Sequence, residues 1–178
     1  MSRHLLRAAA AGVVALLAGL LTTPSAQADV AEFFDVGGHI TYVRVTHGPG
    51  SVGIFAHDDG ISTRAFYHFW IDTNSTNPGP EYKAEVYVAA YPDTPVAHLM
   101  RVANFASGGI KFRCDGLRAE SDPGHTAYVK VIVPRGCIGA PARVRVAVVG
   151  YYNEDSDRAI DVTDWAPGEQ RFYSWVNR

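Results

Sequence analysis

The chain has 178 residues, and its 16 Lys and Arg against 18 Asp and Glu give a formal net charge of −2. A charge this close to balance, with no basic run or arginine-rich face, lacks the cationic surface that neutralises phosphate groups. Nucleic acid and anionic membrane are therefore poor candidates for partners.

The first 28 residues predict a secretory signal peptide. The basic start "MSRHLLR" is followed by an unbroken apolar run, Ala8–Leu21, and then by the small-x-small sequence "AQA" that ends at Ala28. The alternative, a membrane anchor, needs about 18 or more apolar residues, and this run is shorter. We therefore expect cleavage after Ala28 and a secreted, extracellular protein. No later segment is apolar enough to span a membrane.

The remainder, residues 29–178, has the size of one ordinary domain. Because Arg3 and Arg7 leave with the signal peptide, it keeps 14 basic residues against 18 acidic ones. Alternating and β-branched runs, divided by Gly, Pro, Asn and Asp, recur along it without helical periodicity, a pattern typical of an all-β sandwich or barrel. In chain order, strands are expected over 39–47, 51–58, 64–72, 82–90, 97–105, 110–114, 127–134 and 142–152.

We therefore predict a single antiparallel β-sandwich of roughly eight to ten strands. The segment 134–141, "PRGCIGAP", is too rich in Gly and Pro for a strand and predicts a short turn or one helical turn. No linker, repeat or low-complexity segment divides the chain.

Side chains alternate between the two faces of a strand, so each strand predicts an inner and an outer set. The strand 64–72 is bulky on both faces, which predicts a central strand covered on both sides, with Trp70 in the core. Two further strands have a clear alternation. We expect these side chains to face the core: Tyr82, Ala84, Val86, Val88, Ala90, Val144, Val146 and Val148. We expect these to face solvent: Lys83, Glu85, Tyr87, Arg143 and Arg145.

Cys114 and Cys137 are predicted to form a disulfide. A thiol nucleophile would need an activating neighbour and would oxidise outside the cell, and two sulfur atoms alone do not make a zinc site. An even number of cysteines in an oxidising compartment favours the disulfide.

The loop "DTNSTNPGPE", Asp72–Glu81, offers four oxygen-bearing side chains, which calcium prefers as ligands. The same residue types are also those with which a polar turn bonds its own backbone. Pro78 and Pro80 stiffen the loop in either case. We therefore favour a hinge between two strands over a calcium site.

A second acidic loop, Asn153–Asp164, places oxygen ligands at positions that match an EF-hand calcium loop. Three departures weaken the match: Asn153 begins the loop, Arg158 stands where glycine makes the sharp turn, and Asp164 replaces a longer Glu. A solvated acidic loop is the favoured interpretation. No metal and no cofactor is therefore predicted.

The sequence contains no catalytic motif. It has no Gly-x-Ser-x-Gly elbow, no phosphate loop and no pair of histidines at zinc-ligand spacing. The segment His57–Asp59 could serve an acid–base site, but it precedes Gly60 at a strand end and predicts a turn. A glycosidase would be recognised by the distance between its two carboxylates in the fold. Spacing along the chain does not reveal that distance.

Several segments carry a family resemblance: "FWIDTN…GPEYKAEV", "CDGLRAE", "VIVPRGCIGAPARVRVAV" and "DWAPGEQRFYSWV". Together they resemble small secreted actinobacterial proteins of unknown function. The strand that ends in "IDT", followed by "GPEY", also resembles DOMON-like domains and family 9 carbohydrate-binding modules. The resemblance implies an antiparallel β-sandwich of a kind that binds sugars or haem, with Asp72 and Tyr82 in a structural hairpin.

The favoured function is a secreted, non-catalytic binding module for extracellular carbohydrate or another surface ligand. Tyr87 and Tyr91 are the aromatic side chains expected to stack on sugar rings. The first alternative is an envelope or extracellular protein that binds another protein through an apolar patch. The second is a secreted hydrolase, which requires a cleft with converging carboxylates or histidines.

Overall fold

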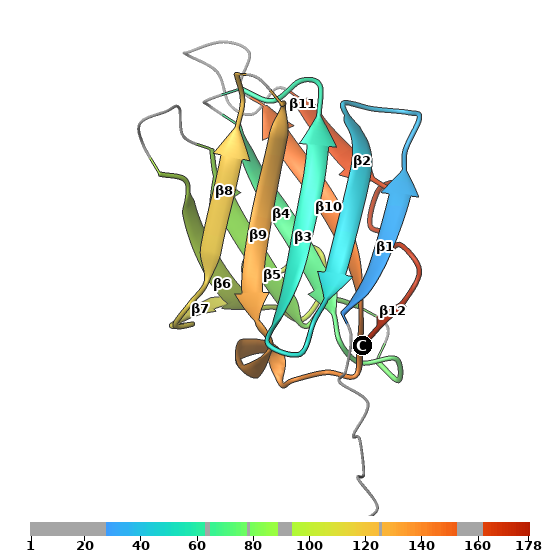
Figure 1. Cartoon of the computed structure of the whole chain (residues 1–178), viewed down its shortest axis with the longest axis vertical. Coiled ribbons are helices and arrows are strands. Elements are labelled where there is room, and N and C mark those ends of the chain that lie inside the picture. Colours follow the sequence, from blue (N-terminus) through green and yellow to red (C-terminus); the bar gives the residue numbers. More distant parts are fainter. Residues whose placement is uncertain (1–27, 63–64, 78, 89–93, 125, 153–161) are drawn as a thin grey trace, which may run out of the picture.

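A computed structural model of the chain describes residues 28–62, 65–77, 79–88, 94–124, 126–152 and 162–178. Twelve strands form two antiparallel sheets that stack face to face (Figure 1). The prediction of an all-β sandwich is confirmed. Residues 1–27 of the predicted signal peptide lie outside the described residues. Within the described ranges no helix has both the length and the apolar character needed to cross a bilayer.

Sheet A contains five strands in the order β1–β2–β3–β9–β8. Their bounds are β1 Asp29–Phe34, β2 Ile40–His47, β3 Ser51–Asp58, β9 Tyr128–Pro134 and β8 Arg118–Asp122. Sheet B has the order β11–β10–β4–β5–β6–β7, and β12 also pairs with β10. Their bounds are β11 Val162–Ala166, β10 Arg143–Tyr152, β4 Phe66–Asp72, β5 Tyr82–Tyr87, β6 Val96–Arg101, β7 Ile110–Phe112 and β12 Val176–Asn177.

All eight predicted strands are present, and four more complete the sheets. Three of the additional strands, β1, β8 and β11, lie at sheet edges, and β12 has only two residues. An edge strand buries less of its surface, so its hydrophobic alternation is weaker in the sequence. Three predicted strands end earlier than expected: β5 ends at Tyr87, β6 at Arg101 and β7 at Phe112. The segment 134–141 contains the short 3-10 helix η1, Arg135–Ile138, as predicted.

The main core lies between the sheets and is filled by their inward side chains. Ala84 and Val86 of β5 are fully buried there, and Val88 nearly so. Val144, Val146 and Val148 of β10 are buried as predicted. Tyr82 is half-buried and packs against this core.

The outer face of sheet B is covered over β4 and β10, and the covering extends to side chains of β5 that were predicted to face solvent. Trp70 is buried there with Ala147 and Val149, away from the main core. Phe105, from the connection between β6 and β7, and Phe172, from the segment after β11, pack against it. We call these five residues the Trp70 cluster.

Lys83 is consequently buried rather than solvated, with 3% of its surface exposed. Glu85, also predicted to be wet, is largely buried beside it and forms an ion pair with it. The prediction that β4 is a central strand covered on both sides is confirmed. It lies between β10 and β5, its Tyr67 and Phe69 are buried in the main core, and its Trp70 is buried on the outer face.

A disulfide joins Cys114 to Cys137, as predicted. Cys114 follows β7 of sheet B, and Cys137 lies in η1 after β9 of sheet A. The disulfide therefore fixes the point where the chain crosses from one sheet to the other.

Candidate functional site

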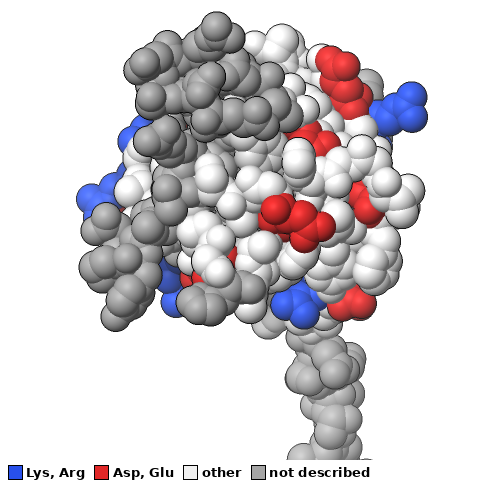
Figure 2. All heavy atoms as spheres, turned by 90° about the horizontal axis from the view of Figure 1, so that it is seen from above, with Lys and Arg blue, Asp and Glu red and all other residues white. Residues whose placement is uncertain are grey.

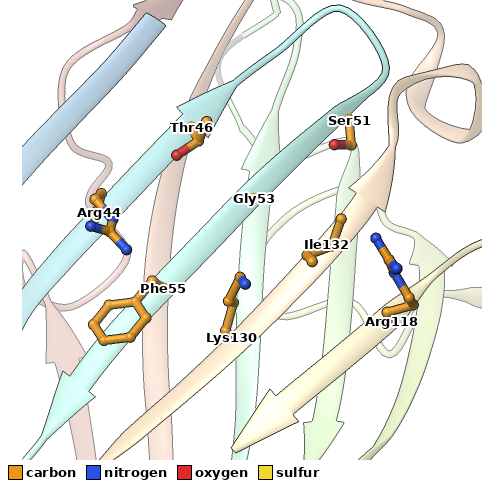
Figure 3. A pocket seen from close by; sticks show the side chains of 8 residues that line it. All are labelled: Arg44, Thr46, Ser51, Gly53, Phe55, Arg118, Lys130 and Ile132. Carbon is orange, nitrogen blue, oxygen red and sulfur yellow. The ribbon is translucent and has the colours of Figure 1, made fainter. Parts of the chain in front are cut away.

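The outer face of sheet A contains a hollow of about 300 Å³, which we call the Gly53 hollow (Figure 3). It is formed by strand side chains from β2, β3, β9 and β8. Its lining residues are Arg44, Thr46, Ser51, Gly53, Phe55, Arg118, Lys130 and Ile132.

Gly53 creates the hollow because it places no side chain on the outer face of β3. Its neighbours across the sheet are Thr46 of β2 and Ile132 of β9. A Cβ added at Gly53 would meet only the Thr46 Cβ, at 3.9 Å, so the space above the glycine is available to a ligand. The floor is thus backbone, and the walls are the side chains of the neighbouring strands.

The hollow is cationic. Arg44, Arg118 and Lys130 contribute three positive charges, and no carboxylate lines it. Lys130 Nζ lies 2.9 Å from Glu120 Oε2, which offsets part of its charge. Among the described residues, none forms a hydrogen bond or ion pair with the Arg118 guanidinium. This concentration of positive charge contrasts with the net charge of −2 on the whole chain.

Positive charge is not gathered at the end of the sandwich in the same way. Seen from above, carboxylates and uncharged residues occupy the middle of the described surface, and Lys and Arg lie at its margin (Figure 2). Among the described residues, the face of sheet A therefore offers the better anion site.

An aromatic stripe crosses the same outer face, from β1 to β9. Phe34 lies 5.2 Å from Tyr42, Tyr42 lies 6.0 Å from Phe55, and Phe55 lies 5.1 Å from Tyr128, measured between ring centroids. The Arg44 guanidinium sits over the Phe55 ring at 5.3 Å. Cation–π contact of this kind orients the guanidinium beside the hollow. The face therefore combines cations, hydroxyl groups and an aromatic wall.

The loop at Asp72–Glu81 bonds its own chain. Asp72 is fully buried, and its Oδ1 accepts from the Asn74 amide at 2.8 Å. Asn74 Oδ1 accepts from the Thr76 amide at 3.0 Å, and Glu81 Oε2 from the Thr73 amide at 2.8 Å. The described residues hold no group of three or more His, Cys, Asp or Glu suited to a metal ion. The loop geometry therefore favours the hinge.

Most of the second acidic loop, residues 153–161, lies outside the described residues. Its last candidate ligand, Asp164, lies in β11 and accepts a hydrogen bond from the Ile40 amide at 2.7 Å. This carboxylate therefore links the two sheets by binding backbone.

The carboxylate of Asp58 also has a structural role. It ends β3, is fully buried and accepts hydrogen bonds from the hydroxyls of Tyr67 and Tyr152. Its other oxygen accepts from the Gly60 amide at 2.7 Å. This arrangement closes the turn that the sequence predicted at His57–Asp59.

Tyr87 lies on the outer face of sheet B with 46% of its surface exposed, and its ring stacks on Phe66 at 5.8 Å. Phe66 in turn stacks on Tyr151 at 4.5 Å. Tyr91 lies outside the described residues. Of the two tyrosines predicted to stack on sugar rings, only Tyr87 therefore lies among the described residues.

His68, Lys83 and Glu85 form a largely buried polar cluster next to these aromatic rings. His68 Nε2 and Lys83 Nζ lie 3.1 Å and 2.8 Å from Glu85 Oε1. Burial, reinforced by the Lys83 charge, lowers the pKa of His68 to about 4. His68 is therefore neutral at pH 7.

The sequence pattern did not identify the residues of the Gly53 hollow as a site. One signal was present, because an isolated glycine inside a strand pattern marks close approach of a ligand or a backbone. The three cations come from three different strands, so only their positions in the sheet bring them together.

Comparison with protein-family models, with curated proteins and with solved structures finds no match to this chain.

Proposed function

We propose that this protein is a secreted, non-catalytic module that binds an acidic carbohydrate outside the cell through the Gly53 hollow. The observation that carries the proposal is the convergence of three cationic side chains, without a carboxylate, on a hollow with an aromatic wall. Its volume of about 300 Å³ lies at the lower end of the range of roughly 300–1,000 Å³ for small-ligand pockets. Secretion is supported by the signal-peptide pattern of residues 1–28 and by the disulfide.

A uronic acid or a sulfated sugar matches each chemical element of the hollow. Its anionic group accepts hydrogen bonds from Arg118 and Arg44, whose planar guanidinium groups offer paired donors. Its hydroxyl groups bind Thr46 and Ser51, and its C–H face packs against Phe55. A neutral sugar would leave the Arg118 guanidinium without an anionic partner among the described residues.

The likeness of the sequence to DOMON-like domains and family 9 carbohydrate-binding modules agrees with this proposal. Those domains are antiparallel sandwiches, and some of them bind sugars. No sugar-binding residue is carried over from them, because the hollow is argued from the side chains of this chain alone.

The test is affinity electrophoresis of residues 29–178 in polygalacturonate and in its methyl ester, which has the same backbone without the charge. We expect retardation by the acid and none by the ester. Binding should also weaken as salt rises from about 0.05 to 0.5 M, because ions screen exposed charges.

Two substitutions address the hollow itself. Gly53→Val places a side chain on the floor, since a Cβ fits there without a clash and Val is favoured in strands. Arg118→Gln removes the cation that has no side-chain partner among the described residues. Each should weaken binding about tenfold or more, which is about 1.4 kcal/mol. Arg113→Gln is the matched control, because that side chain is 88% exposed and lies outside the hollow. Unchanged binding by both hollow variants would refute the proposal.

A protein-binding function is the second candidate, and exposed apolar residues beside β1 favour it. Val30, Phe34 and Val36 are 56%, 76% and 101% exposed. An edge strand with exposed apolar side chains is a template for pairing with another chain. Sedimentation equilibrium would support this candidate if it detected a dimer that Phe34→Lys abolishes. A monomer at all concentrations would count against self-pairing.

A further inference from the structure

We infer that the outer face of sheet B carries a second carbohydrate site, for a hydroxyl-rich saccharide. The site is a cleft of about 520 Å³, which we call the turn cleft. It lies between three turns, at residues 79–80, 104–105 and 170–172, together with Arg145 of β10. The two sites lie on opposite outer faces of the sandwich, so one molecule can bridge two glycan chains.

The three turns are held together by contacts that do not involve a ligand. The Val102 amide donates to the Glu81 carbonyl at 3.0 Å, which ties the second turn to the first. The rings of Phe105 and Phe172 lie 4.9 Å apart, which joins the second turn to the third. The cleft is therefore pre-formed, and little order has to be imposed when a ligand binds.

Arg145 is fixed in orientation. Its Nε and Nη2 lie 2.7 and 2.6 Å from Oδ2 of the buried Asp72. Its guanidinium also lies 4.8 Å from the ring centroids of both Phe172 and Trp175. Because Asp72 balances the charge, this arginine offers aligned N–H donors without a net positive charge. Arg171, which is exposed, also lines the cleft, and its guanidinium can donate to sugar hydroxyls as well. The turn cleft is therefore rich in donors for hydroxyl groups.

Asn104 and Gln170 add two side-chain amides to the lining of the turn cleft. Asn104 Oδ1 accepts from the Ala106 amide at 2.9 Å, which directs its NH₂ group outward as a donor. Gln170, in the third turn, is exposed and can both donate and accept. Together with the phenyl rings of Phe105 and Phe172, these groups match the hydroxyls and C–H faces of a sugar.

The backbone of Gln170 is a further indication. It has a φ of 53°, in the left-handed region that disfavours residues other than glycine. Residues held in such conformations cluster at ligand sites. A glycine would fit this position with less strain, so Gln170→Gly removes the side chain without stressing the backbone.

Tryptophan fluorescence distinguishes the two sites. The rings of Trp70 and Trp165 lie 5.3 and 5.7 Å from Phe105, and Trp175 contacts Arg145. These are all three tryptophans of the chain, and none lines the Gly53 hollow. A ligand in the turn cleft should change the emission, whereas a ligand in the hollow should not.

The experiment titrates residues 29–178 with galactomannan and with xyloglucan, two soluble neutral polysaccharides, while emission is recorded. We expect at least one to change the emission of the wild type. Gln170→Gly should weaken that response about tenfold and leave the melting temperature unchanged or higher, since the strain is relieved. Asn104→Asp, which keeps the turn hydrogen bond, should weaken it too. Gly53→Val is the control and should respond like the wild type.

A role of Gln170 in the fold alone predicts a lower melting temperature and unaltered binding, which would overturn the inference. So would the absence of any change in emission with both polysaccharides.

Bridging rests on the proposed function and is measured separately, as turbidity in a mixture of polygalacturonate and the neutral polysaccharide. The wild type should make the mixture turbid, and either Gly53→Val or Gln170→Gly should prevent this. If only the acidic polymer binds, the turn cleft is refuted and the proposed function stands. If only the neutral polymer binds, the proposed function fails and the turn cleft stands.

Discussion

The two outer faces of the sandwich use the same strand alternation and reach opposite outcomes. On sheet A the outward side chains remain accessible, and a missing side chain at Gly53 leaves a hollow among cations. On sheet B, Phe105 and Phe172 fold over the strands, so Trp70 is only 2% exposed and Lys83 is buried. Whether an outward residue serves binding or stability is therefore decided by the segments that cover it.

The largest loss of stability is expected for Trp70→Ala, on the covered face of sheet B. Removing a buried tryptophan should lower the free energy of unfolding by about 3–5 kcal/mol. Phe55→Ala removes a half-exposed ring of similar chemistry on sheet A and should cost about 1 kcal/mol. Urea titration measures both. Equal losses would mean that the covering of sheet B contributes no stability.

Loss of the disulfide should have the next largest effect, because it links the two sheets. The double substitution of Cys114 and Cys137 by Ala should lower stability by about 3 kcal/mol, as expected for a loop of this length. The crossover leads directly into β8, so binding at Arg118 should weaken as well. Stability measured by guanidinium titration, beside affinity electrophoresis in polygalacturonate, checks both effects. Full affinity in the double variant would show that β8 is positioned without the disulfide.

Acid should destabilise sheet B through His68. Its pKa is lowered to about 4 in the folded protein, whereas an unfolded histidine titrates near 6.5. Between these values the unfolded chain binds more protons, so stability falls as pH decreases from about 6.5 to 4, by about 2–3 kcal/mol. His47, whose pKa burial also lowers, acts in the same direction from sheet A.

His68→Asn isolates this contribution, because it removes the titrating group and leaves His47 in place. Thermal melting of both proteins at pH 7 and pH 4.5 provides the measurement. The variant should lose less stability than the wild type over this interval. The same loss in both would place the acid sensitivity elsewhere, for example at His47.

The smallest effect is expected for Arg118→Gln on sheet A. No described residue pairs with this guanidinium, and exposed charges contribute little to stability. The free energy of unfolding should change by less than about 0.5 kcal/mol. Chemical denaturation would test this, and a larger loss would mean that Arg118 supports the sheet rather than a ligand.

Strong alternation made the central strands predictable. The runs that became β3, β4, β9 and β10 are rich in β-branched and aromatic residues, and each lies in the interior of a sheet. The edge strand β8, "RAESD", contains one apolar residue and gave no such pattern. Lys83 and Glu85 were assigned to solvent because alternation reports the side of a sheet, whereas covering depends on segments distant in sequence.

The candidate sites were less predictable than the fold, for the same reason. Arg44, Arg118 and Lys130 are 74 and 12 residues apart along the chain, and only strand pairing places them around one hollow. The hinge at Asp72 could be anticipated from its turn residues. Its ion pair with Arg145 could not, because it depends on how β4 pairs with β10.

The depth of the Gly53 hollow depends on the residue at a single position. Gly53 does not have the positive φ that would restrict this position to glycine, and its space above the strand is open. Alanine, serine and valine at this position would raise the floor in steps while the cations stay in place. Selectivity among sugars of different size could then be adjusted, in evolution or by engineering, without altering the rest of the sheet.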